Sequence, residues 1–358
     1  MATTRFHFAA LLKKVNPSDE RLEVAQDRPG EVRDWLKDHE FATKSPHSRL
    51  SGSYARDTAI LDIKDVDVLV FLPDDQLDRT PNAVLLEVKK VLDGYPGANV
   101  ETSGQRRSVR MDFPDENLRL DIVPVVAKDG LEKQLSVPDR PAAKWIKSDP
   151  LGYAERLSRV NQKNNGKLVP LVKLVKAWRD VQMKVRRPKS YVLEVMALYA
   201  VENGDITLNG ESTARNLADF FSHIAAKYAD LMENGKESPR IPDPMIPTNL
   251  ITKHWDRSHF ETFMRRIREA DKAAQNALKT DDDDAASAEW AKVFGEYWPT
   301  ADEAKAEAKK QAQVAAVAPG KTKVTNTGGV AGYGSAGTIA TAATSFHGGH
   351  RSGDDSDA

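Results

Sequence analysis

Apolar residues recur at helical spacing along most of the chain and gather into a few short strand-like runs in its first half. Spacings of three and four residues predict amphipathic helices, whereas short β-branched runs bounded by turn residues predict strands. Before Pro150, we expect helices over residues 6–15, 17–38 and 82–92, and strands over 66–72, 108–113 and 118–126. Turn residues 114–117 join the last two runs, which predicts a β-hairpin.

Local signals refine the boundaries of these elements. Asn16 followed by Pro17 is typical of an N-cap and the first position of a helix, and Pro29-Gly30 predicts a bend or break in the helix that follows. Residues 45–53 form a polar connection to a Gly-Ser turn. Residues 54–60 favour a helix over a strand, so we expect this turn at a helix N-terminus.

After Pro150 the pattern is helical. Helices are predicted over residues 151–160, 168–185, 190–202, 213–232, 258–278, 286–297 and 301–314, with a proline-rich surface connection at 239–247. From residue 316 onward the chain is rich in Gly, Ala, Thr and Ser and predicts disorder. We therefore expect three regions: a mixed core with N-terminal helices (1–165), a helical lobe (166–315) and a disordered tail (316–358).

Composition narrows the function. The 358 residues carry 52 basic and 53 acidic side chains, a net charge of −1, so strong nucleic-acid binding is not expected and a small nucleotide substrate fits better. The absence of cysteine excludes disulfides and cysteine-zinc sites. No apolar run is long enough to cross a bilayer, and the N-terminus lacks a convincing secretion signal, so we expect a cytoplasmic protein.

Three acidic residues stand out within apolar runs. Asp65 and Asp67 flank Val66 at the start of the first predicted strand, and Asp121 lies in the second arm of the hairpin. Residues two apart in a strand point to the same side, so Asp65 and Asp67 project together while Val66 and the following valines face a core. If the hairpin pairs beside the first strand, the three acids converge and suit two divalent cations, Mg²⁺ or Mn²⁺.

The Gly-Ser turn at Gly52 and Ser53 precedes these acids. Glycine lets the backbone approach a ligand closely, and a helix N-terminus offers N–H groups to phosphate. An ordinary loop is the simpler interpretation of such a short pair, and a solvated carboxylate pair is the simpler one for Asp65 and Asp67. The combination of a turn, paired acids and a distant acid favours phosphoryl or nucleotidyl transfer.

This combination resembles the polymerase-β-type nucleotidyltransferases. Within that superfamily, GSYARDTAI, KDVDVLVFL, LDIVPV, LVKLVKAWRD and KSYVLEVMAL are most similar to the CD-NTases, the cyclic-oligonucleotide synthases of bacterial anti-phage signalling. The resemblance covers residues 45–200. It implies a two-lobed α+β fold in which a small mixed sheet and a helical C-terminal lobe bind nucleotides in a cleft.

The resemblance assigns roles by position. It implies metal binding and catalysis by Asp65, Asp67 and Asp121, and nucleotide binding by Gly52, Ser53, Lys176, Ser190 and Tyr191. One departure is Asp57, at a position where many relatives have glycine.

Simpler interpretations remain for the second lobe. Lys173 lies one turn from Lys176, so spacing cannot choose between them. Ser190 is equally suited to an N-cap, and Tyr191 to a core position. Arg106, Arg107 and Arg110 lie at the start of the hairpin, where they could contact phosphate or an acceptor.

The expected activity is synthesis of a cyclic di- or trinucleotide from ATP, with GTP or another triphosphate as a further substrate, and release of pyrophosphate. The soluble product would activate a separate effector, and a regulatory protein partner is compatible with this function. Two alternatives stay open: a template-independent RNA nucleotidyltransferase of the terminal adenylyl or uridylyl type, and a non-catalytic nucleotide-binding relative.

Overall fold

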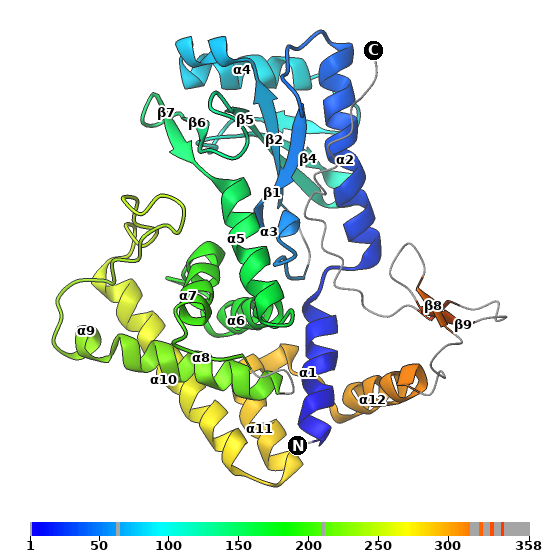
Figure 1. Cartoon of the computed structure of the whole chain (residues 1–358), viewed down its shortest axis with the longest axis vertical. Coiled ribbons are helices and arrows are strands. Elements are labelled where there is room, and N and C mark those ends of the chain that lie inside the picture. Colours follow the sequence, from blue (N-terminus) through cyan, green and yellow to red (C-terminus); the bar gives the residue numbers. More distant parts are fainter. Residues whose placement is uncertain are drawn as a thin grey trace. The chain divides into compact units, whose positions relative to one another are not determined.

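A computed structural model describes residues 2–61, 65–208 and 212–315, and the backbone of three short strands further on. These residues divide into two compact units. Pro17–Arg159 forms the sheet unit, and residues up to Asn16 join the described residues from Val160 onward in the helical unit (Figure 1). The predicted division placed both N-terminal helices with the sheet and the boundary at residue 165, so the structure differs at α1 (Ala2–Val15).

The sheet unit is built on a mixed sheet, as expected for the α+β class. Strands β2 (Asp65–Leu72) and β5 (Leu118–Val126) pair in parallel at the centre, and all other pairs are antiparallel. The order is β1-β2-β5-β4-β3, and a β6-β7 hairpin continues from the end of β5. The remaining strands are β1 (Ser48–Ser51), β3 (Asn99–Glu101), β4 (Val109–Phe113), β6 (Leu135–Asp139) and β7 (Lys144–Ser148).

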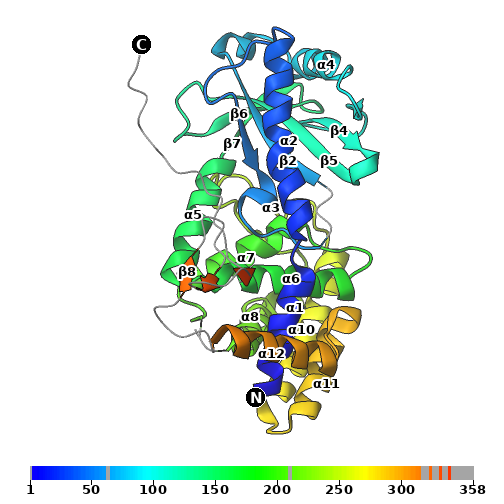
Figure 2. The same ribbon diagram turned by 90° about the vertical axis from the view of Figure 1, so that its right-hand side faces the viewer.

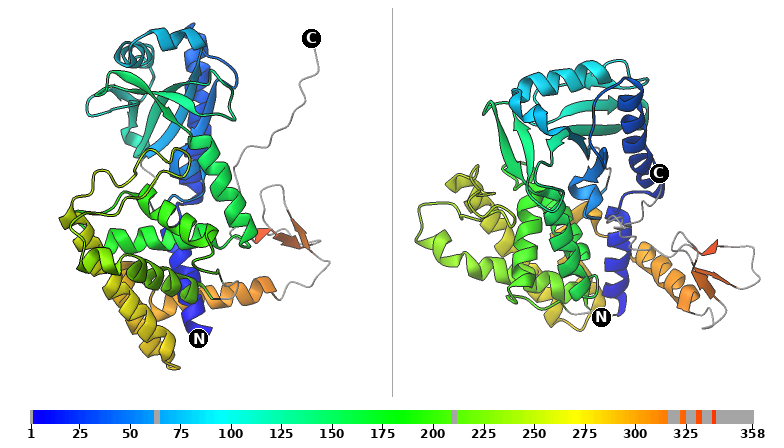
Figure 3. Two further views of the ribbon diagram at one scale, coloured as in Figure 1. Left: turned by 60° about the vertical axis from the view of Figure 1, so that its left-hand side comes forward. Right: turned by 45° about the horizontal axis from the view of Figure 1, so that its top comes forward.

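Burial on both faces is consistent with the central place of β2, since every residue from Val68 to Leu72 is buried. Val66, Val68 and Val70 are fully buried, as predicted, and pack in one core with apolar residues of α2 (Asp19–Asp38) and α4 (Pro81–Leu92) (Figure 3). Burial of each valine side chain contributes about 1.5–3 kcal/mol. The first residues of the opposite face are Asp65 and Asp67, so the same alternation that builds the core presents the acids elsewhere.

The helical unit contains α1 and the helices that follow the sheet unit along the chain. Its buried aromatic residues include Trp178 of α6, which packs on Phe221 and Phe263. Helix α1 joins this unit because Phe8 is buried against Trp290 and other rings of the C-terminal helices. The helices are α6 (Leu168–Gln182), α7 (Ser190–Glu202), α8 (Thr213–Lys227), α9 (Ala229–Glu233), α10 (Arg257–Lys279), α11 (Asp283–Phe294) and α12 (Ala301–Ala315), and α5 (Pro150–Lys163) runs into the unit from the sheet unit. Figure 2 shows α1 beside α12 within the helical unit.

Several predicted boundaries were wrong. The N-cap of α2 is Ser18, whose Oγ accepts from the Arg21 N–H, and the helix continues through Pro29 without a break. The predicted connection before the Gly-Ser turn contains strand β1. The helix predicted over 213–232 ends at Lys227, and a separate helix, α9, follows the cap residue Tyr228. The strands β3, β6 and β7 were not predicted.

Most of the predicted disordered tail lies outside the described residues. The described pieces, β8 (Thr322–Val324), β9 (Val330–Gly332) and β10 (Thr338–Ile339), pair as a small antiparallel sheet in the order β10-β9-β8. Among the described helices, none combines the length and apolar character that a membrane crossing requires.

Candidate active site

The parallel pairing of β2 with β5 brings two of the predicted acids together. Asp67 lies directly opposite Asp121, and Asp65 lies opposite Arg119. Adjacent strands are about 4.8 Å apart, so residues in register are close neighbours on the sheet. The condition set from the sequence, that the hairpin pairs beside the first strand, is therefore met.

The paired acids show the electrostatic strain expected of apposed carboxylates. Burial, and next the charge of Asp121, raises the pKa of Asp67 to about 6, and the nearby Arg56 partly opposes this shift. Burial also raises the pKa of Asp121, against the opposing charge of Arg110. Arg110 lies opposite Asp121 on β4, with its Nε 3.4 Å from Asp121 Oδ1. A cation bound between the acids would relieve this repulsion.

The Gly-Ser turn lies against the same acids. Ser51 pairs with Asp67 across β1 and β2, and the short helix α3 (Gly52–Ala55) begins at the next residue. Gly52 has a φ of +71°, in the left-handed region, and a Cβ built on it would lie 1.9 Å from Asp67 Oδ2. Only glycine allows the turn to approach the carboxylate this closely. Gly52 thus lies against Asp67, Ser53 follows it in α3, and nucleotide binding by these two residues stays a prediction.

The departure at Asp57 has a backbone explanation. Asp57 adopts a φ of +53°, which glycine reaches without strain and which aspartate tolerates better than most residues. A glycine in relatives and an aspartate here are compatible with one loop conformation.

The donor set fits a divalent cation in its chemistry. Carboxylate oxygens are the ligands that Mg²⁺ and Mn²⁺ prefer, and the buried Oδ1 of Asp121 accepts no well-aligned hydrogen bond from any described group. Within residues 2–61, 65–208 and 212–315, however, no three acidic or histidine side chains gather closely enough to hold a metal ion as they stand. The Asp65 side chain is 56% exposed and lies 4.0 Å from Arg119.

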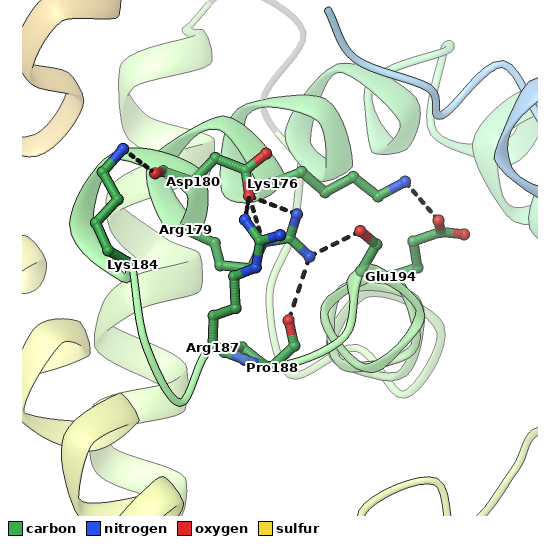
Figure 4. A network of polar contacts seen from close by, with 8 residues as sticks. Lys176, Arg179, Asp180, Lys184, Arg187, Pro188 and Glu194 are labelled. Carbon is green, nitrogen blue, oxygen red and sulfur yellow. Dashed lines mark hydrogen bonds and ion pairs between the residues drawn. The ribbon is translucent and has the colours of Figure 1, made fainter. Parts of the chain in front are cut away.

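Lys176 does not present the free ammonium that a triphosphate contact requires. Its side chain is 2% exposed, and its Nζ forms a 2.5 Å ion pair with Glu194 of α7 (Figure 4). The alternative residue, Lys173, is also buried. A contact between Lys176 and a triphosphate stays a prediction, and it requires the ammonium to exchange a carboxylate for phosphate.

Ser190 and Tyr191 open helix α7. Ser190 is not the N-cap, which is Lys189, and its Oγ instead accepts a 2.7 Å hydrogen bond from Arg179. Tyr191 is half-buried and donates through its hydroxyl to Asp243. These residues belong to the helical unit, whereas the acids and the Gly-Ser turn belong to the sheet unit.

Two polar residues at this site were missed in the sequence. Arg179 and Glu194 contact Ser190 and Lys176, respectively, across α6 and α7. Glu194 had a readable signal, since it is an acid inside the apolar run SYVLEVMALYA. Arg179 had none, because an arginine near a helix end usually pairs with solvent or the last carbonyls.

Comparison with known proteins agrees with this geometry. The Second Messenger Oligonucleotide or Dinucleotide Synthetase (SMODS) domain matches residues 1–161. A cyclic AMP-AMP-AMP synthase from Acinetobacter sp. is 30% identical over 319 residues, which cover 83% of this chain and 86% of that protein.

Solved structures extend the likeness to the whole fold. CdnC of E. coli MS115-1 with ATP covers 84% of this chain and 98% of its own, at 20% identity and a TM-score of 0.65. The CD-NTase CdnG of Bradyrhizobium diazoefficiens in complex with GTP covers 85% and 96%, at 17% identity and a TM-score of 0.64. The fold and the paired acids define a polymerase-β-like nucleotidyltransferase. The chain belongs to the CD-NTase family, the cyclic-oligonucleotide synthases of anti-phage signalling, as the sequence motifs predicted.

Proposed function

We propose that this nucleotidyltransferase joins three AMP units from ATP into a cyclic trinucleotide. The name of the relative at 30% identity supports adenosine as the base and three as the ring size. Each bond forms between a ribose hydroxyl oxygen and the α-phosphorus of ATP, and pyrophosphate leaves. Because such transfer depends on positioning and charge neutralisation, the acids of the sheet unit carry the chemistry.

The roles of the acids follow from their positions. Asp65 and Asp67 hold the divalent cation that accompanies the donor triphosphate, once the Asp65 side chain has turned from Arg119 toward Asp67. Asp121 would help to bind a second cation, which lowers the pKa of the acceptor hydroxyl. Mg²⁺ or Mn²⁺ supplies neutralisation of the phosphates and a lower pKa of the attacking hydroxyl when bound. Gly52 and Ser53 place backbone N–H groups beside the phosphates.

The observation that carries this proposal is the Asp67–Asp121 register with Gly52 packed against it. The test is mass spectrometry of products made from the four ribonucleoside triphosphates in magnesium. We expect a cyclic product of three AMP units from wild type and none from Asp65→Asn/Asp67→Asn. Asp74→Asn, which removes an acid paired with Lys44 on the surface, serves as the control and keeps wild-type activity.

The same experiment separates the alternatives. An RNA nucleotidyltransferase would need an added RNA primer, whereas a cyclic synthase uses nucleotides alone. A non-catalytic relative would release no pyrophosphate in magnesium. Normal triphosphate consumption by the double mutant would show that the acids were assigned wrongly.

The setting of the reaction is also a proposal. The enzyme acts in the cytoplasm, where its triphosphate substrates are abundant, and its product reaches a separate effector by diffusion. A regulatory protein partner stays a prediction from the sequence.

A further inference from the structure

Arg179 is buried at the junction of α6, α7 and the loop between them. Its side chain is 8% exposed, and every nitrogen of the guanidinium has a partner (Figure 4). Nε and Nη2 donate to Asp180 Oδ1 at 2.8 and 2.5 Å, and Nη1 donates to the Pro188 carbonyl at 3.2 Å and to Ser190 Oγ at 2.7 Å. One side chain thus links the end of α6 to the first residue of α7.

The hydrogen bond to Ser190 constrains the direction of the serine hydroxyl. Arginine has five donors and no acceptor. The Ser190 hydroxyl must therefore accept a hydrogen bond from Arg179 and cannot donate one to it. No other residue in the described part of the chain accepts the Ser190 O–H. The hydroxyl hydrogen is therefore left to donate to a group outside the described chain, and the nearby positive charge makes it a stronger donor.

Arg179 itself is not a ligand contact. Its side chain is 8% exposed, and four of its five guanidinium N–H groups donate to groups of the protein, which disfavours a direct contact with phosphate. Asp180 balances its charge and also accepts a 3.4 Å contact from Nη1 of Arg187, whose side chain is 55% exposed. The arrangement acts on Ser190 alone among the residues predicted to contact nucleotide.

We infer that Arg179 is a positioning residue, which holds the Ser190 hydroxyl as a donor toward a phosphate of the bound nucleotide. The inference rests on the proposed function, and it takes the contact between Ser190 and nucleotide from the family resemblance. Arg179 acts only through Ser190, so its effect on nucleotide binding must vanish when the hydroxyl is removed.

A double-mutant cycle tests this. Binding of a non-hydrolysable ATP analogue in magnesium is measured by calorimetry for wild type, Arg179→Gln, Ser190→Ala and the double mutant. We expect Ser190→Ala to weaken binding about tenfold, the value of a hydrogen bond to a charged group, and Arg179→Gln to weaken it by nearly as much. The double mutant should bind no more weakly than Ser190→Ala alone.

Controls separate positioning from stability. Arg187→Gln removes another cation from Asp180 without touching Ser190 and should leave analogue binding unchanged. Ser190→Thr keeps a hydroxyl and should restore the sensitivity to Arg179→Gln. If Arg179→Gln does not fold, Arg179→Lys, which keeps the charge, replaces it in the cycle. Arg179→Lys should weaken binding in the wild-type background but not in the Ser190→Ala background. Thermal unfolding of each variant is recorded alongside.

The outcomes are distinct. Equal loss from Arg179→Gln in both backgrounds would show that Arg179 stabilises the loop rather than orienting the serine. Unchanged binding by Ser190→Ala would also overturn the inference, yet cyclic product from wild type would keep the proposed function. A coupled cycle in a protein that makes no cyclic product would support the inference and refute the function.

Discussion

At the scale of single residues, the close approach of Gly52 to Asp67 is the most demanding feature of the site. Gly52→Ala adds a Cβ 1.9 Å from Asp67 Oδ2, so the carboxylate must move by more than an ångström. A shift of that size costs about 100-fold in kcat/KM. The left-handed φ adds about 1–2 kcal/mol of destabilisation.

Gly97→Ala is the matched control for this prediction. Gly97 also has a left-handed φ, +75°, but a Cβ there meets nothing within 4 Å. It should lose similar stability in urea unfolding and keep its kcat/KM. Equal activity of the two variants would contradict the role assigned to Gly52.

The raised pKa of Asp67 predicts that its ionised carboxylate, which the proposed function requires, destabilises the folded protein. The pKa of Asp67 is about 6 in the folded state, above the ordinary 3.8. The contribution of this group to the free energy of unfolding is therefore fully present below pH 4 and is lost as the pH rises through 6. At pH 7 without metal, the ionised Asp67 lowers the free energy of unfolding by about 2–3 kcal/mol. Asp67→Asn should therefore raise the free energy of unfolding at pH 7 in a chelator and leave it unchanged at pH 4.

Asp139→Asn should change the free energy of unfolding at pH 7 in the opposite direction. Hydrogen bonds and charge from Arg106, with help from Arg107 and the Ala142 N–H, overcome its burial and lower the pKa of Asp139. Its removal should destabilise the protein at pH 7. The two unfolding curves, measured from pH 4 to 8, distinguish a strained acid from a satisfied one. If Asp67→Asn lost stability at pH 7, the raised pKa of Asp67, which burial and then the charge of Asp121 produce, would be refuted.

At the scale of elements, α6 and α7 are joined by the buried pair Lys176–Glu194. Removing one partner of a buried pair leaves an uncompensated charge and costs about 3–5 kcal/mol. We expect Glu194→Gln to lose this much in urea unfolding, and Lys176→Met/Glu194→Leu to recover most of it. Glu269→Gln, which breaks an exposed pair with Arg266, should cost under about 1 kcal/mol. An equally small cost at Glu194 would contradict the packing described for these helices.

The elements also show what the sequence could and could not predict. Strand β2, the β4–β5 hairpin and the long helices follow from periodicity, because each has an apolar face. Strand β1 has one apolar residue in four and is held by backbone pairing with β2, which no side-chain pattern records. The acids could be predicted since they interrupt buried strands. The ion pair of Lys176 could not be predicted, because its partner Glu194 lies on the next helix, α7.

At the scale of the whole molecule, chain order and spatial grouping differ. Helix α1 precedes the sheet unit but belongs to the helical unit, since Phe8 is buried among rings from the C-terminal end. Periodicity predicted the helix and said nothing about its neighbours. The residues predicted to bind nucleotide fall in both units.

Ligand binding should be visible in the stability of the whole molecule. A ligand that binds only the folded state adds about 2.7 kcal/mol at a hundred times its Kd, which raises the Tm of a molecule of 358 residues by about 4 °C. We expect Mg²⁺ with a non-hydrolysable ATP analogue to produce such a shift in wild type by calorimetry. Mg²⁺ alone should give a smaller rise, because it relieves the repulsion between Asp67 and Asp121. In Asp65→Asn/Asp67→Asn the magnesium-dependent part should disappear, and an undiminished shift would place the cation elsewhere.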